Sequence, residues 1–211
     1  MVIAKKYGQM EILTAENITA PHCFTTRYGG VSTGAQASLN LALREGESME
    51  NVEKNLHILG SALIFDPKKM VLTRQIHSDI VVKVGRADRG KHMVEGASPE
   101  CDALITNEPG VALVVFTADC TPIVFHDPVT GAVGATHAGW RGTAQDIGGK
   151  VIAAMVEHFG CDPANIRCAI GPNLGKCHFA TDGDVPHALI GTFGREALSY
   201  IEKRGDKFYP D

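Results

Sequence analysis

Three residues with metal-binding side chains, His77, Cys120 and His137, each follow a short run rich in Val, Ile, Leu or Phe. Such runs are typical of buried strands, so each residue is expected close to a strand end. Two imidazoles and one thiolate are suitable ligands for zinc, and three protein ligands leave a fourth coordination position open for water or substrate. An open position distinguishes a catalytic site from a structural one, so these residue types predict a catalytic zinc site.

Taken singly, the same residues have ordinary structural explanations. A histidine after a strand, such as His77, is commonly a hydrogen-bonded turn residue, and a lone cysteine such as Cys120 is commonly a small buried hydrophobe. Their spacing does not by itself bring the three together. A Cys–His hydrolase is a second interpretation, with Cys120 as nucleophile, His137 as its base, and Asp119 or Asp102 orienting the imidazole.

The strongest local signal is HAGWRG at 137–142, which combines a potential ligand, an aromatic ring, a guanidinium and two glycines. Glycine permits close approach of a phosphate, so Arg141 and Arg27, each close to glycine in the sequence, are predicted to bind an anion. Gln75 and Asn40 carry both donor and acceptor groups and are candidates for binding a base edge or a sugar hydroxyl. For each of these four side chains, surface exposure or turn hydrogen bonding is the alternative.

Several other catalytic signatures are absent from the sequence. There is no His-Glu-x-x-His, and no His-x-Glu with Pro-Cys-x-x-Cys, which excludes zincins and cytidine deaminases. The glycine-containing segment 171–176 has the wrong length for a phosphate-binding P-loop and lacks its Ser or Thr. The glycines at 29, 30 and 34 do not form a dinucleotide-binding fingerprint.

Composition limits the class of protein. The 211 residues are 44% hydrophobic and 21% charged, which suits one compact domain. The net charge is -4 and there is no Lys/Arg block, so nucleic acid is not the expected partner. The N-terminal residues form neither a secretory signal nor a membrane span, and the six cysteines include no Cys-x-x-Cys pair. We therefore expect a cytoplasmic protein with reduced thiols and no membrane association.

The elements that must position the candidate site follow from apolar patterns and turn residues. A helix is expected to begin at Ser48, and a second at Thr143 as N-cap, with Asp146 three residues on. The helix start at Thr143 would point its backbone N–H groups toward the site and favour an anion. Residues 86–100 are expected to be a mobile loop and 182–203 a helix. Strands are expected at 22–28, 69–73, 80–84, 103–106, 111–117, 123–125, 132–136 and 166–170.

One pair of strands bears directly on the site. The turn at 127–131 joins neighbouring strands closely enough to predict an antiparallel hairpin. Cys120 and His137 would then lie at the same end of that hairpin. Mixed strand directions with helices outside them predict an α+β fold, a layered single domain with a mixed, partly antiparallel β core and outer helices.

Six motifs resemble, in order, those of the bacterial YfiH family, also called the laccase-domain or polyphenol oxidase family, whose members include peptidoglycan-editing factors. The motifs are TRYGGVS (26–32), SLNL (38–41), QIHS (75–78), ADCTP (118–122), HAGWRG (137–142) and GP (171–172). The resemblance implies an α+β fold, one zinc ion held by His77, Cys120 and His137, and phosphorolysis of adenosine, inosine and methylthioadenosine, with adenosine deamination as a further activity. We discount the copper-dependent laccase label, because one His–Cys–His set has too few ligands for a multicopper cluster.

Two departures from the family pattern are visible. The family usually continues past the segment that matches 207–211, so residues 1–211 are interpreted as a single YfiH-like domain that lacks the family's C-terminal end. The family also commonly has Cys-Cys-Tyr-Glu where this chain has Cys177, His178, Phe179 and Ala180. The second departure leaves the roles of Cys177 and His178 open.

The predicted partners are a purine nucleoside and phosphate, handled by a monomer or homodimer. Two alternatives remain at this point. The first is a cysteine hydrolase or amidase that edits peptidoglycan precursors, and the second is an inactive binding module.

Overall fold

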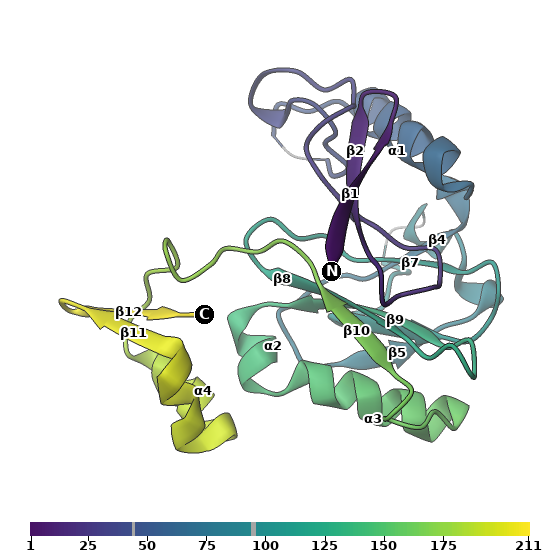
Figure 1. Ribbon diagram of the computed structural model, residues 1–211. Coiled ribbons are helices and arrows are strands. Elements are labelled where there is room, and N and C mark those ends of the chain that lie inside the picture. The colour runs from purple at the N-terminus through teal and green to yellow at the C-terminus, as the bar shows by residue number, and fades with distance from the viewer. Residues whose placement is uncertain (44, 94–95) are drawn as a thin grey trace.

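A five-stranded mixed sheet forms the centre of the computed structural model, which describes residues 1–43, 45–93 and 96–211. Its strand order is β10-β8-β9-β6-β5, and only the β5–β6 pair is parallel (Figure 1). This arrangement confirms the predicted α+β class. The strands are β5 (Val81–Lys83), β6 (Ala103–Thr106), β8 (Thr121–His126), β9 (Val133–Ala138) and β10 (Arg167–Ile170).

One face of this sheet is covered by helix α3 (Ile147–Phe159) (Figure 1). Its residues Ile147, Val151 and Met155 recur at helical spacing and are fully buried against the sheet. On the sheet side they meet Ile105 and Phe125. The helix expected in this part of the sequence is confirmed.

The predicted start of this helix at Thr143 is wrong. A short helix, α2 (Trp140–Ala144), comes first, and α3 is a separate helix whose N-cap is Asp146. The backbone of Asp146 is left-handed (φ 56°), which breaks the two helices apart, and its carboxylate accepts a hydrogen bond from the Gly149 N–H (3.1 Å). Thr143 therefore lies inside α2 and caps nothing.

The N-terminal part forms a second layer that includes the three-stranded sheet β1 (Val2–Tyr7), β2 (Met10–Ala15) and β3 (Phe24–Thr25). Helix α1 (Met49–Leu63) packs on this layer through Leu59, which joins a cluster with Ile12. As predicted, this helix begins at Ser48, which is its N-cap: the Ser48 hydroxyl accepts a hydrogen bond from the Asn51 N–H (3.1 Å). The β1–β2 hairpin was not predicted, and only two residues of the expected strand 22–28 pair in a sheet.

Two further short strands, β4 (Met70–Leu72) and β7 (Ala112–Val114), pair in parallel. They are the paired parts of the predicted strands 69–73 and 111–117. The expected loop 86–100 contains 3-10 turns at Arg86–Asp88 and Lys91–Met93, and its residues 94–95 lie outside the described part of the chain. Two more 3-10 turns occupy Gly34–Gln36 and Pro67–Lys69.

The C-terminal elements are α4 (Asp184–Phe193), a 3-10 segment (Gly194–Tyr200), β11 (Ile201–Arg204) and β12 (Lys207–Pro210). They follow an extended segment, 171–183, and α4 lies beside α2 (Figure 1). The Thr192 hydroxyl donates a hydrogen bond to the Ala144 carbonyl. The predicted helix 182–203 is confirmed over α4 but wrong at its end, where residues 201–203 pair in the β11–β12 hairpin.

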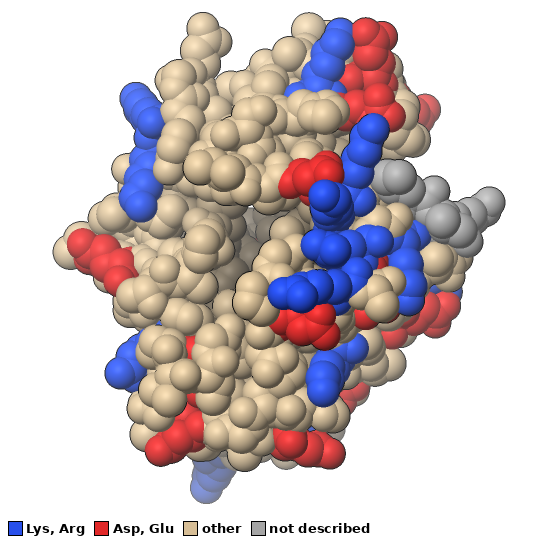
Figure 2. Space-filling view, turned by 90° about the vertical axis from the view of Figure 1, so that its right-hand side faces the viewer, with Lys and Arg blue, Asp and Glu red and all other residues tan. Residues whose placement is uncertain are grey.

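The described helices include none that is both long enough and apolar enough to cross a bilayer. On the face shown in Figure 2, Lys and Arg side chains gather along one side of a hollow, and Asp and Glu side chains lie among them. Several basic side chains are paired locally, including Lys54 with Glu50 (2.7 Å) and Lys91 with Asp88 (2.6 Å). Because acidic side chains lie among the basic ones, the face shown in Figure 2 is not uniformly basic.

A buried amide organises the loop that follows β3. Asn55 of α1 is 0% exposed, and its side-chain oxygen Oδ1 accepts a hydrogen bond from the Val31 N–H (2.8 Å). Its NH₂ group donates to the Ser32 hydroxyl (2.9 Å) and to the Asn40 carbonyl (2.7 Å). Gly30 allows this approach, because a Cβ there would lie 2.5 Å from the Asn55 amide oxygen. Asn55 thus fixes the loop that carries both Arg27 and Asn40.

Replacing Asn55 with leucine is expected to lower the free energy of unfolding by about 3 kcal/mol, because several buried backbone and hydroxyl groups lose their partner. Urea denaturation measures this change. The matched control is Glu53→Leu on the exposed face of the same helix, where we expect a change within about 0.5 kcal/mol. Equal effects of the two substitutions would contradict the role given to Asn55.

Candidate metal centre

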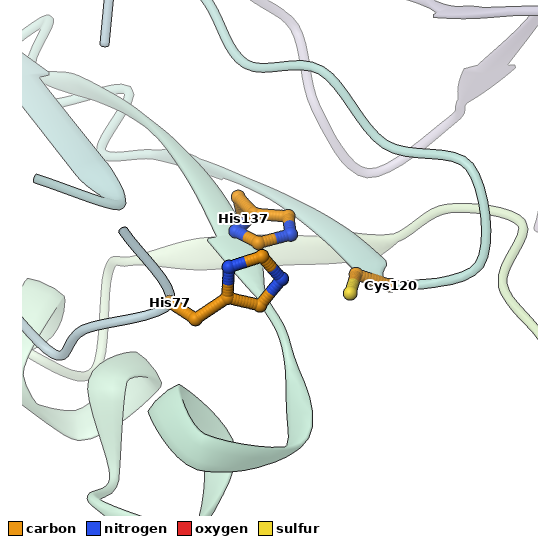
Figure 3. A group of neighbouring side chains, drawn as sticks. All are labelled: His77, Cys120 and His137. Atoms are coloured by element: carbon orange, nitrogen blue, oxygen red, sulfur yellow. The ribbon is translucent and has the colours of Figure 1, made fainter. Parts of the chain in front are cut away.

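The side chains of His77, Cys120 and His137 converge, as predicted. One ligand atom from each lies within 4.8 Å of the others, and in Figure 3 the three side chains lie around one common space. His137 is only 3% exposed, Cys120 is half-buried and His77 is exposed, so the group opens toward solvent on one side.

The β8–β9 hairpin brings Cys120 and His137 together. The strands pair antiparallel with Pro122 opposite His137 and Thr121 opposite Ala138. Cys120 immediately precedes β8, so its side chain lies beside the end of β9. The hairpin predicted from the turn at 127–131 is confirmed, and it accounts for two of the three ligands.

His77 reaches the site from the loop between β4 and β5. Its backbone is left-handed (φ 58°), an unusual conformation for a residue with a side chain. Asp102, at the start of β6, holds this loop: its carboxylate accepts from the backbone N–H groups of Ile76 (3.2 Å), His77 (3.1 Å) and Ser78 (2.6 Å). The two imidazoles meet edge to face with their ring centroids 4.8 Å apart.

The Asp102 carboxylate also contacts the second imidazole, with its Oδ1 2.8 Å from His137 Nδ1. Asp102 is 0% exposed. Burial alone would raise its pKa, but hydrogen bonds from Ser78 and His137 outweigh that effect and lower it, so the group is a carboxylate at neutral pH. Of the two aspartates considered as orienting groups, Asp102 has this position, whereas Asp119 is exposed.

Gly139 leaves the space around which the three ligands meet. A Cβ at this position would lie 2.9 Å from His77 Cδ2, 3.4 Å from Cys120 Sγ and 3.6 Å from His137 Cε1. The backbone φ of Gly139 is -70°, so the constraint is space rather than conformation. Two imidazoles and a thiol around a cradle that even one methyl group would crowd fit a single metal ion.

Burial raises the pKa of the Cys120 thiol, and the negative charges of Asp119 and Asp102 add to this effect. Within the described residues, neither imidazole is hydrogen-bonded to the thiol. A protonated thiol is a poor nucleophile, whereas a bound cation would favour the thiolate. The electrostatics therefore suit Cys120 better as a metal ligand than as a free nucleophile.

The predicted nucleoside-binding side chains have partners within the protein. Both polar atoms of the Gln75 amide bond the backbone of Phe116, at 2.8 and 2.7 Å. Asn40 Nδ2 donates to the Ala42 carbonyl and to Glu47 Oε2, both at 2.9 Å. Gln75 thereby ties the His77 loop to the segment that leads to Cys120. That Gln75 and Asn40 contact the substrate remains a prediction.

The two predicted anion-binding arginines differ in their surroundings. Arg27 Nε and Nη2 donate to the Ala37 carbonyl at 2.9 and 2.6 Å, so one edge of its guanidinium is already bonded. Arg141 lies in α2, two residues after Gly139, where its guanidinium stacks on the Trp140 ring at 4.3 Å from the ring centroid. Both side chains are exposed, and their role toward an anion remains a prediction.

The segment 171–174 runs beside the Cys120 loop, a feature that sequence reasoning missed. Leu174 N–H donates to the Asp119 carbonyl (2.9 Å), and Asn173 Nδ2 donates to the Thr121 hydroxyl (3.1 Å). Farther along, the exposed Cys177 and His178 contact each other, with Sγ 3.0 Å from Nδ1. They are not part of the described three-residue metal group.

Known proteins resemble this chain over most of its length. The curated purine nucleoside phosphorylase YlmD of Geobacillus stearothermophilus is 38% identical over 175 residues, which are 82% of this chain and 64% of that protein. Purine nucleoside phosphorylase YfiH of Escherichia coli is 34% identical over 189 residues, 90% of this chain and 72% of that protein. This chain thus spans about two thirds of the length of these relatives.

Solved structures show the same fold. The crystal structure of YlmD from Geobacillus stearothermophilus superposes with a TM-score of 0.90 at 33% identity, covering 100% of this chain and 80% of that one. A YfiH protein of Bacillus licheniformis gives a TM-score of 0.85 at 27% identity, covering 99% of this chain and 79% of that one. Residues 21–211 match the family described as multi-copper polyphenol oxidoreductase laccase. The chain therefore belongs to this laccase-like family, which includes the YlmD and YfiH proteins.

Proposed function

We propose that this protein is a zinc-dependent purine nucleoside phosphorylase that also deaminates adenosine. The observation that carries the proposal is the convergence of His77, Cys120 and His137 on one space that opens to solvent. The names of the relatives support the phosphorylase activity. Substrates would be adenosine, inosine and methylthioadenosine, together with inorganic phosphate.

Zinc is the metal that we propose for this site. Within the described part of the chain there is one such cluster, a single set of two nitrogen donors and one sulfur donor. This set matches a catalytic zinc ion with one open position, and it has too few ligands for a multicopper cluster. A bound zinc ion would supply Lewis acidity and lower the pKa of a water at the open position.

The remaining roles fall to the side chains around the ion. Arg141 and Arg27 would hold phosphate while one of its oxygens forms a bond to C1′ of the ribose and the glycosidic bond to the purine breaks. The base leaves with the proton that hydrogen phosphate carried, and ribose 1-phosphate remains. Gln75 and Asn40 would bind the nucleoside edges. Positioning and charge neutralisation of this kind supply most of the rate enhancement in such transfers.

The same proposal includes a cytoplasmic location and a monomer or homodimer that acts on small molecules, without nucleic acid or membrane. All six cysteines are free thiols, and Cys101 and Cys161 are buried, as expected of a protein kept in a reducing compartment.

The test is an incubation of the purified, zinc-loaded chain with adenosine, with and without phosphate, followed by chromatography of the products. We expect adenine and ribose 1-phosphate only when phosphate is present, and inosine in both cases. Metal-stripped protein should form none of these products, and readdition of zinc should restore all of them. Absence of all products with the zinc-loaded chain would refute the proposal, and adenosine binding without turnover would indicate a binding module.

One observation keeps a cysteine hydrolase as a second candidate: the His137–Asp102 pair resembles the base and orienting group of a catalytic triad. This function predicts that metal-free protein is modified at Cys120 by iodoacetamide faster than at Cys168, and that it cleaves a peptidoglycan peptide. Peptide cleavage by the metal-free protein would favour this candidate over the phosphorylase.

A further inference from the structure

We propose that Asp102 is a positioning residue of the metal centre, which fixes two of its three ligands with one carboxylate. The inference rests on the metal centre of the proposed function but not on the reaction catalysed there. Asp102 sits at the start of β6, and its own backbone bonds both neighbouring segments: its N–H donates to the Ile80 carbonyl (3.2 Å) and its carbonyl accepts from the His137 N–H (2.7 Å).

The two carboxylate oxygens are saturated by five donors. Oδ1 accepts from the His77 N–H (3.1 Å) and faces His137 Nδ1 (2.8 Å). Oδ2 accepts from the N–H groups of Ile76 (3.2 Å) and Ser78 (2.6 Å) and from the Ser78 hydroxyl (2.7 Å). A carboxylate offers about four lone-pair sites. Asp102 therefore has no oxygen left for an ion and is not a fourth ligand.

This saturation determines which nitrogen of His137 meets the ion. A carboxylate that already accepts from four donors can only accept from His137 as well, so Nδ1 carries the proton. The lone pair of neutral His137 then lies on Nε2. Asp102 therefore selects the Nε2 ligand and fixes the orientation of a ring that is 3% exposed.

The same carboxylate fixes the backbone under His77. Three consecutive N–H groups, at residues 76–78, point at Asp102, and this arrangement holds the left-handed conformation of His77. Cys120 has no such link, because the β8–β9 pairing places it. Without the Asp102 carboxylate, the His77 loop should therefore lose its fixed conformation and His137 its fixed tautomer. Cys120 should stay in place.

The experiment compares wild type, Asp102→Asn and the control Asp127→Asn, all metal-free and then titrated with zinc. Asp127 is also 0% exposed and accepts backbone N–H groups, from Val129 (2.8 Å) and Thr130 (3.4 Å), but it lies at the far end of the β8–β9 hairpin. The Asp127→Asn control therefore shows how zinc affinity changes when a buried aspartate outside the site is replaced by asparagine.

In competition with a chelator, zinc affinity should fall about 10–100-fold in Asp102→Asn and stay at the wild-type value in Asp127→Asn. With Co²⁺ in place of zinc, the thiolate-to-cobalt absorption from Cys120 should persist in Asp102→Asn at saturating metal. Wild-type zinc affinity in folded Asp102→Asn would overturn the inference.

A second measurement needs no variant. Nitrogen-15 NMR of metal-free wild-type protein, at a pH well above the histidine range, should show His137 as the Nδ1–H tautomer. The Nε2–H tautomer there would overturn the inference even if Asp102→Asn does not fold. None of these readouts involves turnover. A chain that binds zinc in this way but lacks phosphorylase activity would therefore refute the proposed function and leave the role of Asp102 standing.

Discussion

Replacing Cys120 with alanine is expected to abolish zinc retention and to reduce phosphorolysis on the order of 10³-fold, because two imidazoles alone cannot hold the ion and its several kcal/mol of transition-state stabilisation are lost. The substitution removes the one ligand that is neither an imidazole nor fixed by Asp102. Elemental analysis after dialysis against a weak chelator measures the first effect, and the adenosine–phosphate assay measures the second.

The matched control for this substitution is Cys168→Ala on β10, because Cys168 is also a free thiol but is exposed. That variant should retain zinc and activity at wild-type values. Wild-type turnover by Cys120→Ala protein shown to contain no metal would eliminate a metal-dependent mechanism.

Replacing Gly139 with alanine should reduce turnover about 100-fold while the fold persists, since a displacement of about 1 Å in a reacting group can cost that much. The added methyl group would lie 2.9 Å from His77 Cδ2, so the imidazole must shift away from position 139 and leave its place in the metal group. The alanine backbone itself is unstrained there, because φ is -70°. Thermal unfolding and zinc titration should show near-normal stability with weakened metal binding.

Gly148 supplies the comparison. It lies in α3, where a Cβ would meet nothing within 4 Å, so Gly148→Ala should raise stability by about 0.5–1 kcal/mol and leave activity unchanged. If Gly139→Ala behaved in the same way, the space at Gly139 would not be needed by the metal.

The parts of the site that the sequence predicts are those built from local pairing. A polar turn between two apolar runs is sufficient to predict the β8–β9 hairpin, and the hairpin places Cys120 near His137. The arrival of His77 depends instead on parallel pairing of β5 with β6 and on a carboxylate 25 residues away. Single-sequence patterns do not encode such long-range pairings, so the convergence could only be hypothesised.

The missed features have similar causes. Asp102 precedes an apolar strand and was interpreted only as one of two possible orienting groups, because nothing in its neighbours shows that five donors would surround it. The rule that pairs Thr143 with Asp146 is misleading here, because Asp146 is itself the N-cap of α3 and its side chain accepts the capping hydrogen bond. In the N-terminal hairpin, the alternation of Met10 and Ile12 was a readable signal, and Gly8 at the turn (φ 63°) supported it.

The pairing of Pro122 with His137 also constrains how the gene can change in length. Adding or deleting one residue inside β9 would bring Thr136 or Ala138 into the ligand's place and turn the imidazole to the opposite side. The tip of the hairpin carries no such restriction, because Val129 there is 74% exposed. A peptide tag grafted at that tip should therefore be tolerated, whereas a single-codon deletion within β9 should inactivate the protein.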